Sequence, residues 1–439
     1  LIGLVGSEMC IRDRLNIVGI IFMLLYLYQI LFIAVGTFAR RKKYPEAKKY
    51  HTFAILICGR NEEKVIGNLI DSIQNNNYPQ EKIRIFVCAD NCDPTDRTAA
   101  IAREKRCIVY ERHDQSAIGK GYALRLMFDN IANDFPAYEP DAIMVFDADN
   151  LLAPNYIAEM NKALDSGIQV CTSFRNSKNY GTNWVSAGAS LSFVRECQFF
   201  HKPKAALGLS THVSGTGFYF SKEVMSFKTG WPYTMITEDL EFSASNTLKG
   251  VKIGYCEDAE FFDEQPTKFK QAYKQRLRWC KGGLMGFSLF HRSLLGTFFK
   301  TQDFTYYEYY FSRFFPVGAY YSFSFVASCI VNTLARVLEA LNGQVIANAV
   351  YFMAPLLIAL FTTYMGLFVD SVFACLVNWK RIRATTKQKI MSMFALPLFT
   401  MLISMPASVA ALFKKVKWEP IEHNESITQR QLEEMSSNG

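Results

Sequence analysis

Four long apolar stretches divide this chain into a soluble part and parts suited to a lipid bilayer. They run approximately over residues 15–36, 314–334, 346–368 and 390–413. Each is close to the roughly 20 residues that a helix needs to cross the hydrocarbon core. With 50% hydrophobic residues, the chain is too apolar for a disordered or fibrous protein. We therefore expect one membrane helix, a soluble segment, and then a bundle of about three membrane helices within residues 311–413.

The charges beside the first stretch predict the side of the membrane on which the soluble segment lies. Arg40, Arg41, Lys42 and Lys43 follow that stretch directly. Because basic residues flank membrane helices on the cytoplasmic side, we expect an integral protein of the plasma (inner) membrane with a cytoplasmic soluble domain. The placement of the net charge of +8 beside apolar runs favours the lipid bilayer over nucleic acid as a partner.

The C-terminal part gives conflicting signals about the number of crossings. Three crossings after the soluble segment would place the polar tail, residues 414–439, outside the cell. Lys414 and Lys415 argue instead that the tail lies inside. Pro397 and Pro406 lie in the last apolar stretch, so a broken or re-entrant segment is the alternative. The sequence leaves this parity open.

Two further segments are set apart from the soluble domain. Residues 7–14 read SEMCIRDR, which resembles a translated sequencing adaptor, so we expect residues 1–14 to be a non-native leader. Residues 284–310 are expected to form amphipathic helices at the membrane surface. The soluble domain is therefore expected within residues 50–283.

Short apolar runs alternate with helical patterns in the first part of that domain. The runs at 53–58, 83–89, 107–110 and 142–146 are expected to be strands, and those at 63–76, 95–106 and 121–133 helices. The alternation predicts an α/β fold with a Rossmann-like, mainly parallel sheet, which binds ligands beyond the carboxyl ends of its strands. No G-x-G-x-x-G, Walker or C-x-x-C motif is present, so dinucleotide-binding, phosphate-loop and structural-zinc proteins lack their signatures here.

Polar clusters follow three of the predicted strands. They are Arg60-Asn61-Glu62, Asp90-Asn91 and Asp147-Ala148-Asp149. A polar residue after a strand is often only a turn or capping residue, but three clusters at one sheet edge predict a shared crevice. Mg²⁺ and Mn²⁺ take oxygen ligands, and Asp147 and Asp149 supply two carboxylates at the end of a buried strand. We therefore expect a metal site there, although a lone D-x-D also occurs by chance.

The segment Thr237-Glu238-Asp239 precedes a predicted helix that begins near Leu240. The simpler interpretation is a capping box, with Thr237 as the N-cap and acidic residues in the first turn. The functional alternative is that Asp239 faces the crevice as a general base. The neighbouring residues in space decide between the two.

The segment Gln275-Arg276-Leu277-Arg278-Trp279 carries groups suited to a diphosphate and a sugar. Arg278 can form two parallel hydrogen bonds with a diphosphate, and Trp279 offers a flat apolar face to a sugar ring. The alternative is a basic amphipathic helix that lies on the membrane. The two interpretations are compatible.

Four of these segments, which we call the four motifs, resemble in their order the motifs of the family 2 glycosyltransferases. They are Asp90, Asp147-Ala148-Asp149, Thr237-Glu238-Asp239 and Gln275-Arg276-Leu277-Arg278-Trp279. The similarity is to the membrane-bound branch, which includes cellulose, chitin and hyaluronan synthases and ceramide glucosyltransferase, and it covers about residues 53–283. It implies a GT-A fold and inverting transfer of a sugar from a nucleotide diphosphate, with Mg²⁺ or Mn²⁺ as cofactor. The expected donor is a UDP-linked hexose or N-acetylhexosamine, and the expected acceptor is a saccharide at the membrane, with polysaccharide synthesis as one outcome.

The resemblance also implies roles for individual residues. Asp239, with Glu238 beside it, would be catalytic, and Asp149 with Asp147 would bind the metal. The donor would contact Arg60, Asn61, Glu62, Asp90, Lys120, Asp147 and Arg278. The acceptor would contact Gln275, Trp279 and the loop residues Gly215, Thr216 and Gly217.

Two features depart from the family pattern. Asp90 is followed by Asn91, where the family often has a second aspartate, and the membrane part is smaller than in the large polysaccharide synthases, which argues against a full secretion channel. One alternative function is transfer of a single sugar to a lipid acceptor, either a polyprenyl phosphate or a ceramide-like lipid. A non-catalytic membrane scaffold is a remoter alternative, because Asp147, Asp149 and Asp239 are all intact.

Overall fold

A mixed β-sheet forms the centre of the soluble domain. The computed structural model describes residues 17, 19–341, 349–416, 419, 423, 425–429 and 431, so the expected leader and most of the polar tail lie outside the described residues. The strand order is β3-β2-β1-β4-β7-β6-β8-β5. The strands are β1 (Phe53–Gly59), β2 (Ile83–Asp90), β3 (Ile108–Arg112), β4 (Ala142–Asp147), β5 (Leu151–Leu152), β6 (Val170–Ser177), β7 (Phe218–Ser221) and β8 (Ile253–Asp263).

The directions of the strands bring several carboxyl ends to one edge of the sheet. β1 pairs in parallel with β2 and β4, and β2 with β3. β7 runs antiparallel to both β4 and β6, so β6 and its parallel partner β8 point the same way as β4. This confirms the expected mainly parallel α/β sheet, and it adds β8 to the strands that end at the ligand-binding edge.

Helices cover both faces of the sheet because successive side chains of each strand point to opposite faces. In β1, Phe53, Ile55 and Ile57 pack in the core beneath α3 (Ile66–Gln74) and α6 (Tyr156–Asp165). Ala54 and Leu56 pack in the other core, beneath α5 (Lys120–Asp134). The remaining helices of this part are α4 (Thr98–Glu104), α7 (Trp184–Glu196), α8 (Lys202–Ala206) and α9 (Glu238–Leu248).

One long helix, α10 (Phe269–Thr301), carries the Gln275 to Trp279 motif and joins the soluble domain to the membrane helices. The expected boundary between residues 283 and 284 falls inside this helix. A short helix, α11 (Phe304–Tyr309), and a π-helical turn, η4 (Tyr310–Phe314), follow it.

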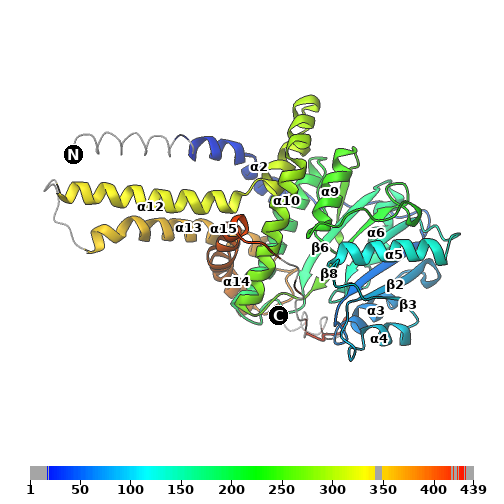
Figure 1. Ribbon diagram of the computed structural model, residues 1–439. Coiled ribbons are helices and arrows are strands. Elements are labelled where there is room, and N and C mark those ends of the chain that lie inside the picture. The colour runs from blue at the N-terminus through cyan, green and yellow to red at the C-terminus, as the bar shows by residue number, and fades with distance from the viewer. Residues whose placement is uncertain are drawn as a thin grey trace.

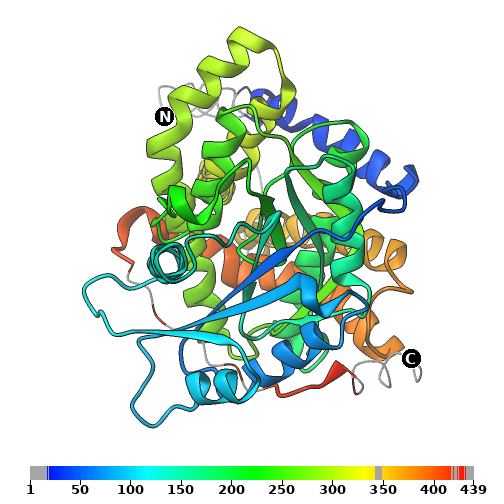
Figure 2. The same cartoon turned by 90° about the vertical axis from the view of Figure 1, so that its right-hand side faces the viewer.

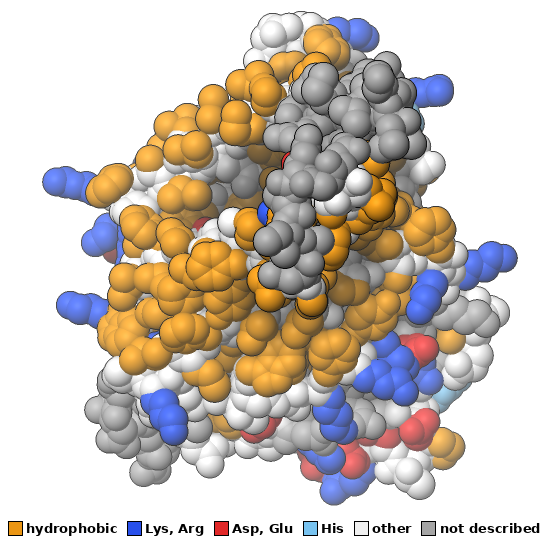
Figure 3. Space-filling view, turned by 90° about the vertical axis from the view of Figure 1, so that its left-hand side faces the viewer, with side chains coloured by type: hydrophobic (Ala, Val, Ile, Leu, Met, Phe, Trp, Pro, Cys, Tyr) orange, Lys and Arg blue, Asp and Glu red, His pale blue; other side chains and the backbone are white. Residues whose placement is uncertain are grey.

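Among the residues that the structure describes, four helices are long and apolar enough to cross a membrane. They are Gly19–Phe38, which contains α2 (Tyr28–Phe38), α12 (Val317–Leu341), α13 (Ala349–Val377) and Thr386–Phe413. The expected start of the third span, residue 346, lies outside the described residues. Figure 1 shows α12 and α13 side by side, extending away from the sheet. Figure 3 looks onto this end of the molecule, where hydrophobic side chains dominate the surface.

The last apolar segment consists of α14 (Thr386–Phe399), a π-helical turn (Thr400–Ser404) and α15 (Met405–Phe413), and it packs back onto the soluble domain. At its start, Gln388 Nε2 donates to the Gly181 carbonyl oxygen at 3.2 Å. At its end, Lys281 Nζ donates to the Ala411 carbonyl oxygen at 3.1 Å. Both ends of this segment therefore contact the soluble domain. The parity of the crossings stays a prediction.

Candidate active site

A cavity of about 400 Å³ opens at the sheet edge where β1, β2, β4 and β8 end. Helices α9 and α10 form its opposite wall. The sequence-predicted residues that line it are Arg60, Glu62, Asp90, Lys120, Asp147, Asp149, Gly215, Glu238, Asp239, Gln275, Arg278 and Trp279. Four motifs that are far apart in the sequence therefore meet at one site.

Lys120 connects the end of β4 to the loop that carries Gly215. It lies at the start of α5, and its Nζ forms an ion pair with Asp147 and donates to the Gly215 carbonyl oxygen at 2.6 Å. Burial alone would lower the pKa of Lys120, but the charges of Asp147 and Glu238 raise it, so the side chain stays protonated. One cation therefore holds two walls of the cavity together.

Asp149 is buried and lies among other polar groups at the end of β4. Its Oδ2 accepts from the Glu264 backbone N–H at 2.9 Å, and its Oδ1 accepts from Asn150 Nδ2 at 3.2 Å. Burial would raise the pKa of Asp149, but the nearby charges of His423 and Lys178 lower it overall, so the carboxylate is ionised. An ionised, buried carboxylate close to Asp147 fits a divalent cation with oxygen ligands.

His423 enters the same end of the cavity from the C-terminal tail, and the sequence analysis missed it. Its Nδ1 lies 2.9 and 3.0 Å from the two carboxylate oxygens of Glu62. The charges of Asp149 and Glu62 outweigh burial and raise the pKa of His423 to about 10. Figure 2 shows the red C-terminal segment beside blue N-terminal elements. In the same segment, the Glu425 N–H donates to the Glu264 carboxylate at 3.0 Å.

Asp90 lies at the end of β2 in a buried ion pair. Arg112 Nη1 donates to its Oδ1 at 2.8 Å, and Asn91 Nδ2 donates to the same oxygen at 3.0 Å. Burial nevertheless raises the pKa of Asp90 above its usual value. Asn91, which replaces the second aspartate of the family pattern, adopts a left-handed backbone with φ 54° and accepts from the Asp114 N–H at 2.8 Å. It orients Asp90 and the following loop.

Glu238 and Asp239 begin α9, with Thr237 at the expected N-cap position and acidic residues in the first turn, but the hydrogen bonds of a capping box are absent. Thr237 makes no side-chain capping hydrogen bond. The Glu241 carboxylate instead accepts from the N–H groups of Thr234 and Met235 at 2.9 Å. Burial, and then repulsion by Asp239, raises the pKa of Glu238 to about 8, while the pKa of Asp239 is raised chiefly by burial. Both carboxyl groups are therefore harder to ionise than free ones.

Helix α10 brings Arg278 and Trp279 to the cavity from the opposite side. Burial lowers the pKa of Arg278, and the negative charges of Asp147 and Asp239 act against that shift. The Trp279 ring meets the Phe193 ring edge-on, with centroids 5.9 Å apart. Helix α10 can approach the start of α9 closely because residue 282 is glycine: a Cβ there would lie 2.2 Å from the Thr237 hydroxyl oxygen.

Three sequence-predicted residues, Asn61, Thr216 and Gly217, do not line this cavity. Asn61 Nδ2 donates a hydrogen bond to Asp93 Oδ2 at 2.8 Å. The Thr216 hydroxyl accepts from the Asp147 N–H at 2.9 Å, and at Gly217, with φ 65°, a Cβ would clash with Phe261. These residues support the walls of the cavity because their polar groups and close packing are used within the protein.

Other lining residues were missed by the sequence analysis, among them Arg175 and Asp263. Arg175 Nε donates to Asp263 Oδ2 at 2.6 Å, and its Nη1 donates to the Ser214 carbonyl oxygen at 3.2 Å. Asp263 ends β8, so the rule that placed Asp90 and Asp147 at the sheet edge would also have found it once β8 was recognised. No local signal could have found His423, because the interacting Glu62 is 361 positions away.

The solved structure of a mannosyltransferase from Pyrobaculum calidifontis, in complex with GDP-Man and Mn²⁺, has a similar fold. Its TM-score is 0.52, and the match covers 92% of this chain and 99% of that chain at 14% identity. This likeness shows the fold, a GT-A domain with flanking apolar helices.

Comparison of sequences gives distant relatives with related activities. A probable glycosyltransferase of Sulfolobus acidocaldarius is 26% identical over 58% of this chain and 55% of its own length. A β-monoglucosyldiacylglycerol synthase of Synechocystis is 23% identical over 53% of this chain and 48% of its own. A poly-β-1,6-N-acetyl-D-glucosamine synthase of Staphylococcus aureus is 24% identical over 56% of each. The chain thus spans about half the length of the relatives that it matches.

The family model described as "Glycosyltransferase like family 2" matches residues 51–282, which is more than half of the chain and includes nearly all of the cavity wall. Together with the meeting of the four motifs at one sheet edge, this match establishes that the chain belongs to the family 2 glycosyltransferases.

Proposed function

We propose that this glycosyltransferase moves one sugar from a nucleotide diphosphate to an acceptor hydroxyl at the membrane, with inversion at the anomeric carbon. The observation that carries the proposal is that Asp147, Asp149, Asp239 and Arg278 line one cavity. A UDP-linked hexose or N-acetylhexosamine is the proposed donor, and a saccharide at the membrane is the proposed acceptor.

Asp147 and Asp149 are the groups that would hold Mg²⁺ or Mn²⁺. The ionised state of Asp149 and the oxygen-rich donor set fit such an ion. When bound, the ion would neutralise negative charge on the departing diphosphate. Arg278 supports the same charge from the opposite wall, and a preorganised group of this kind commonly contributes about 3 kcal/mol to transition-state stabilisation.

Asp239 is the proposed general base. A single displacement requires the acceptor hydroxyl to lose its proton while it attacks, and a carboxylate in reach typically supplies about 10²–10⁴ in rate. Glu238, with its pKa raised to about 8, is protonated at neutral pH and therefore serves as a hydrogen-bond donor beside the base. One base suffices because inversion needs no covalent intermediate.

The acceptor side of the cavity lies near the membrane helices, and this supports an acceptor drawn from the bilayer. Arg313 lines the cavity, and α12 begins shortly after it at Val317. Arg40 to Lys43 follow the first apolar helix, which favours a cytoplasmic catalytic domain in the inner membrane. A lipid acceptor that receives one sugar is the second candidate function, favoured by this same position.

The decisive experiment incubates the purified protein in nanodiscs with labelled nucleotide sugars and with Mg²⁺ or Mn²⁺. We expect one donor to be consumed in the presence of the ion, and sizing of the product separates a polymer from a single addition. If no nucleotide sugar of the panel is turned over with either ion, although UDP binds, the proposal is wrong.

A further inference from the structure

The cavity continues past Asp239 toward the membrane, beyond the residues that the proposed function uses. Its far end is lined by Glu196, His212, Ser312 and Arg313. The last two belong to η4, just before α12, so this end lies where the soluble domain meets a membrane helix. None of these residues belongs to the four motifs.

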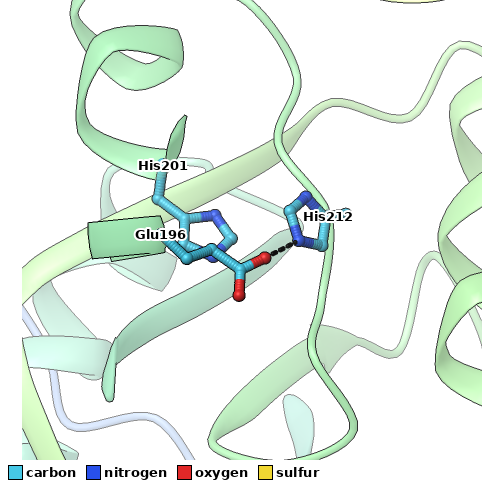
Figure 4. A group of neighbouring side chains, drawn as sticks. All are labelled: Glu196, His201 and His212. Carbon is cyan, nitrogen blue, oxygen red and sulfur yellow. Dashed lines mark hydrogen bonds and ion pairs between the residues drawn. The ribbon is translucent and has the colours of Figure 1, made fainter. Parts of the chain in front are cut away.

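Two π-helical turns shape this end. Glu196 is the last residue of α7, directly before the π-helical turn η2 (Cys197–His201), and Arg313 lies in η4. Turns of this kind are rare and occur frequently at functional sites. Here they bring two distant segments onto one carboxylate: Arg313 Nη2 and His212 Nε2 lie 2.6 and 2.9 Å from Glu196 Oε1. Figure 4 shows Glu196 meeting His212, with His201 beside both.

The group of Glu196, His201 and His212 has the composition of a metal site, since its ligand atoms lie within 4.8 Å of one another. Two contacts oppose that use. The Arg313 guanidinium already binds the carboxylate and would repel a divalent cation. His201 Nδ1 is engaged by the Thr211 hydroxyl at 2.5 Å. The group is therefore better suited to hydrogen bonding than to metal binding.

Several buried polar atoms at this end have no hydrogen-bond partner among the described residues. They are His212 Nδ1, Gln275 Oε1, Ser312 Oγ and Arg313 Nε. Buried polar groups are normally satisfied, so such a group indicates a ligand or water. The set contains an acceptor that cannot donate, Gln275 Oε1, and a donor that cannot accept, Arg313 Nε. Hydroxyl groups satisfy both kinds, whereas an ionised phosphate only accepts.

The charges at this end also favour a neutral ligand. Arg313 and His212 outweigh burial and hold the pKa of Glu196 well below its usual value, so Arg313 is neutralised by an ionised carboxylate. Arg276 adds one positive charge, but its guanidinium lies against rings, 4.5 Å from the Trp279 centroid and 5.5 Å from that of Phe193. An anionic headgroup would therefore have to face Glu196.

We infer that Glu196, His212, Ser312 and Arg313 form an acceptor subsite for a neutral, hydroxyl-rich headgroup, such as a sugar or glycerol, and select against a phosphate at that position. The inference rests on the proposed function and specifies its acceptor. The four residues act as specificity-determining groups: they bind the acceptor beyond the reacting hydroxyl, while Asp239 carries out the proton transfer.

The first test replaces one unpartnered hydroxyl, in Ser312→Ala. The matched control is Ser190→Ala, because the Ser190 hydroxyl is likewise buried and unpartnered in the described structure but does not line this cavity. With diacylglycerol, monoglucosyldiacylglycerol and free cellobiose as acceptors, we expect Ser312→Ala to raise the acceptor KM about tenfold, the loss of one hydrogen bond. UDP affinity should stay the same in both variants, and the control should keep the wild-type KM. An unchanged KM in Ser312→Ala for every acceptor that is used overturns the inference.

The second test changes the charge balance. Glu196→Gln leaves Arg313 without its counterion, so this variant should lose activity with neutral acceptors and gain activity with polyprenyl phosphate. A wild-type enzyme that already prefers polyprenyl phosphate overturns the inference but leaves the proposed sugar transfer intact. If Glu196→Gln does not fold, Ser312→Ala and the wild-type acceptor preference still decide. If the wild-type enzyme glycosylates one of the neutral lipids or cellobiose, the inference is supported in either case. The acceptor that it uses then identifies the source of the headgroup.

Discussion

Two parts of the catalytic domain are built differently: the donor half, the part around β1 to β4 that we propose binds the donor, and the acceptor half, the part around α7, η2 and η4 that we propose binds the acceptor. In the donor half, β1 to β4 are regular strands, and the site residues follow directly from the strand ends. In the acceptor half, two π-helical turns and a buried ion-pair network place the side chains. There, Phe174 and Leu191 share a hydrophobic core with Ala374, Cys375 and Leu396 of the C-terminal apolar helices. The acceptor half is therefore completed by the membrane part, whereas the donor half has its own cores.

The largest effect should come from the catalytic pair where the halves meet. Asp239→Asn should lower the transfer rate by about 10²–10⁴, because the base is lost. Glu238→Gln should retain most activity, since an amide still donates as the protonated acid does. Rates and UDP binding are measured for both. Near-normal turnover by Asp239→Asn would exclude this residue as the base.

The donor half should depend on the metal site. Asp149→Ala should abolish the part of UDP affinity that needs Mn²⁺, because it removes a buried, ionised ligand. Asp129→Ala, a change of the same type at an exposed position of α5, serves as the control. Calorimetry with and without Mn²⁺ measures the difference. An ion-dependent affinity that survives in Asp149→Ala would place the metal elsewhere.

The acceptor half should be the part whose stability depends on buried charges. Lys204 and Glu308 form an ion pair in which both side chains are almost fully buried, at 0% and 1% exposure. Lys204→Met leaves the carboxylate unpaired and should cost about 3–5 kcal/mol of unfolding free energy. In the donor half, breaking the exposed pair of Lys228 and Glu139 should change little. Equal thermal shifts in Lys204→Met and Lys228→Met would remove this contrast.

The smallest effect concerns the tail that closes the donor end. His423→Ala should modestly strengthen Mn²⁺ affinity, because a protonated imidazole beside Asp149 competes with the ion for that carboxylate. Asp147 and Asp149 remain in place, so nucleotide binding should be retained. Titration of Mn²⁺ by electron paramagnetic resonance gives the affinity directly. Wild-type affinity in this variant would show that His423 only anchors the tail.

The sequence predicted the donor half well because its signals are local. The β4 strand and the Asp147 to Asp149 pair follow from a short apolar run that ends in polar residues, and the structure places them at the expected edge. The same local rules placed Thr237 at the N-cap of α9 but did not predict that its side chain makes no capping hydrogen bond. Thr216 was suggested by the family resemblance and not by a local pattern, and its hydroxyl is used within the protein.

The amino-acid sequence by itself determined the alternation of strands and helices, the four apolar stretches and the order of the motifs, because each depends on neighbouring residues. Only the tertiary structure decided that the last apolar segment contacts the soluble domain, that His423 reaches Glu62, and that Glu196 meets Arg313. These contacts join residues far apart in the chain. They form because burying a polar or charged group is favourable only when a partner is available, and the fold alone determines which partner that is.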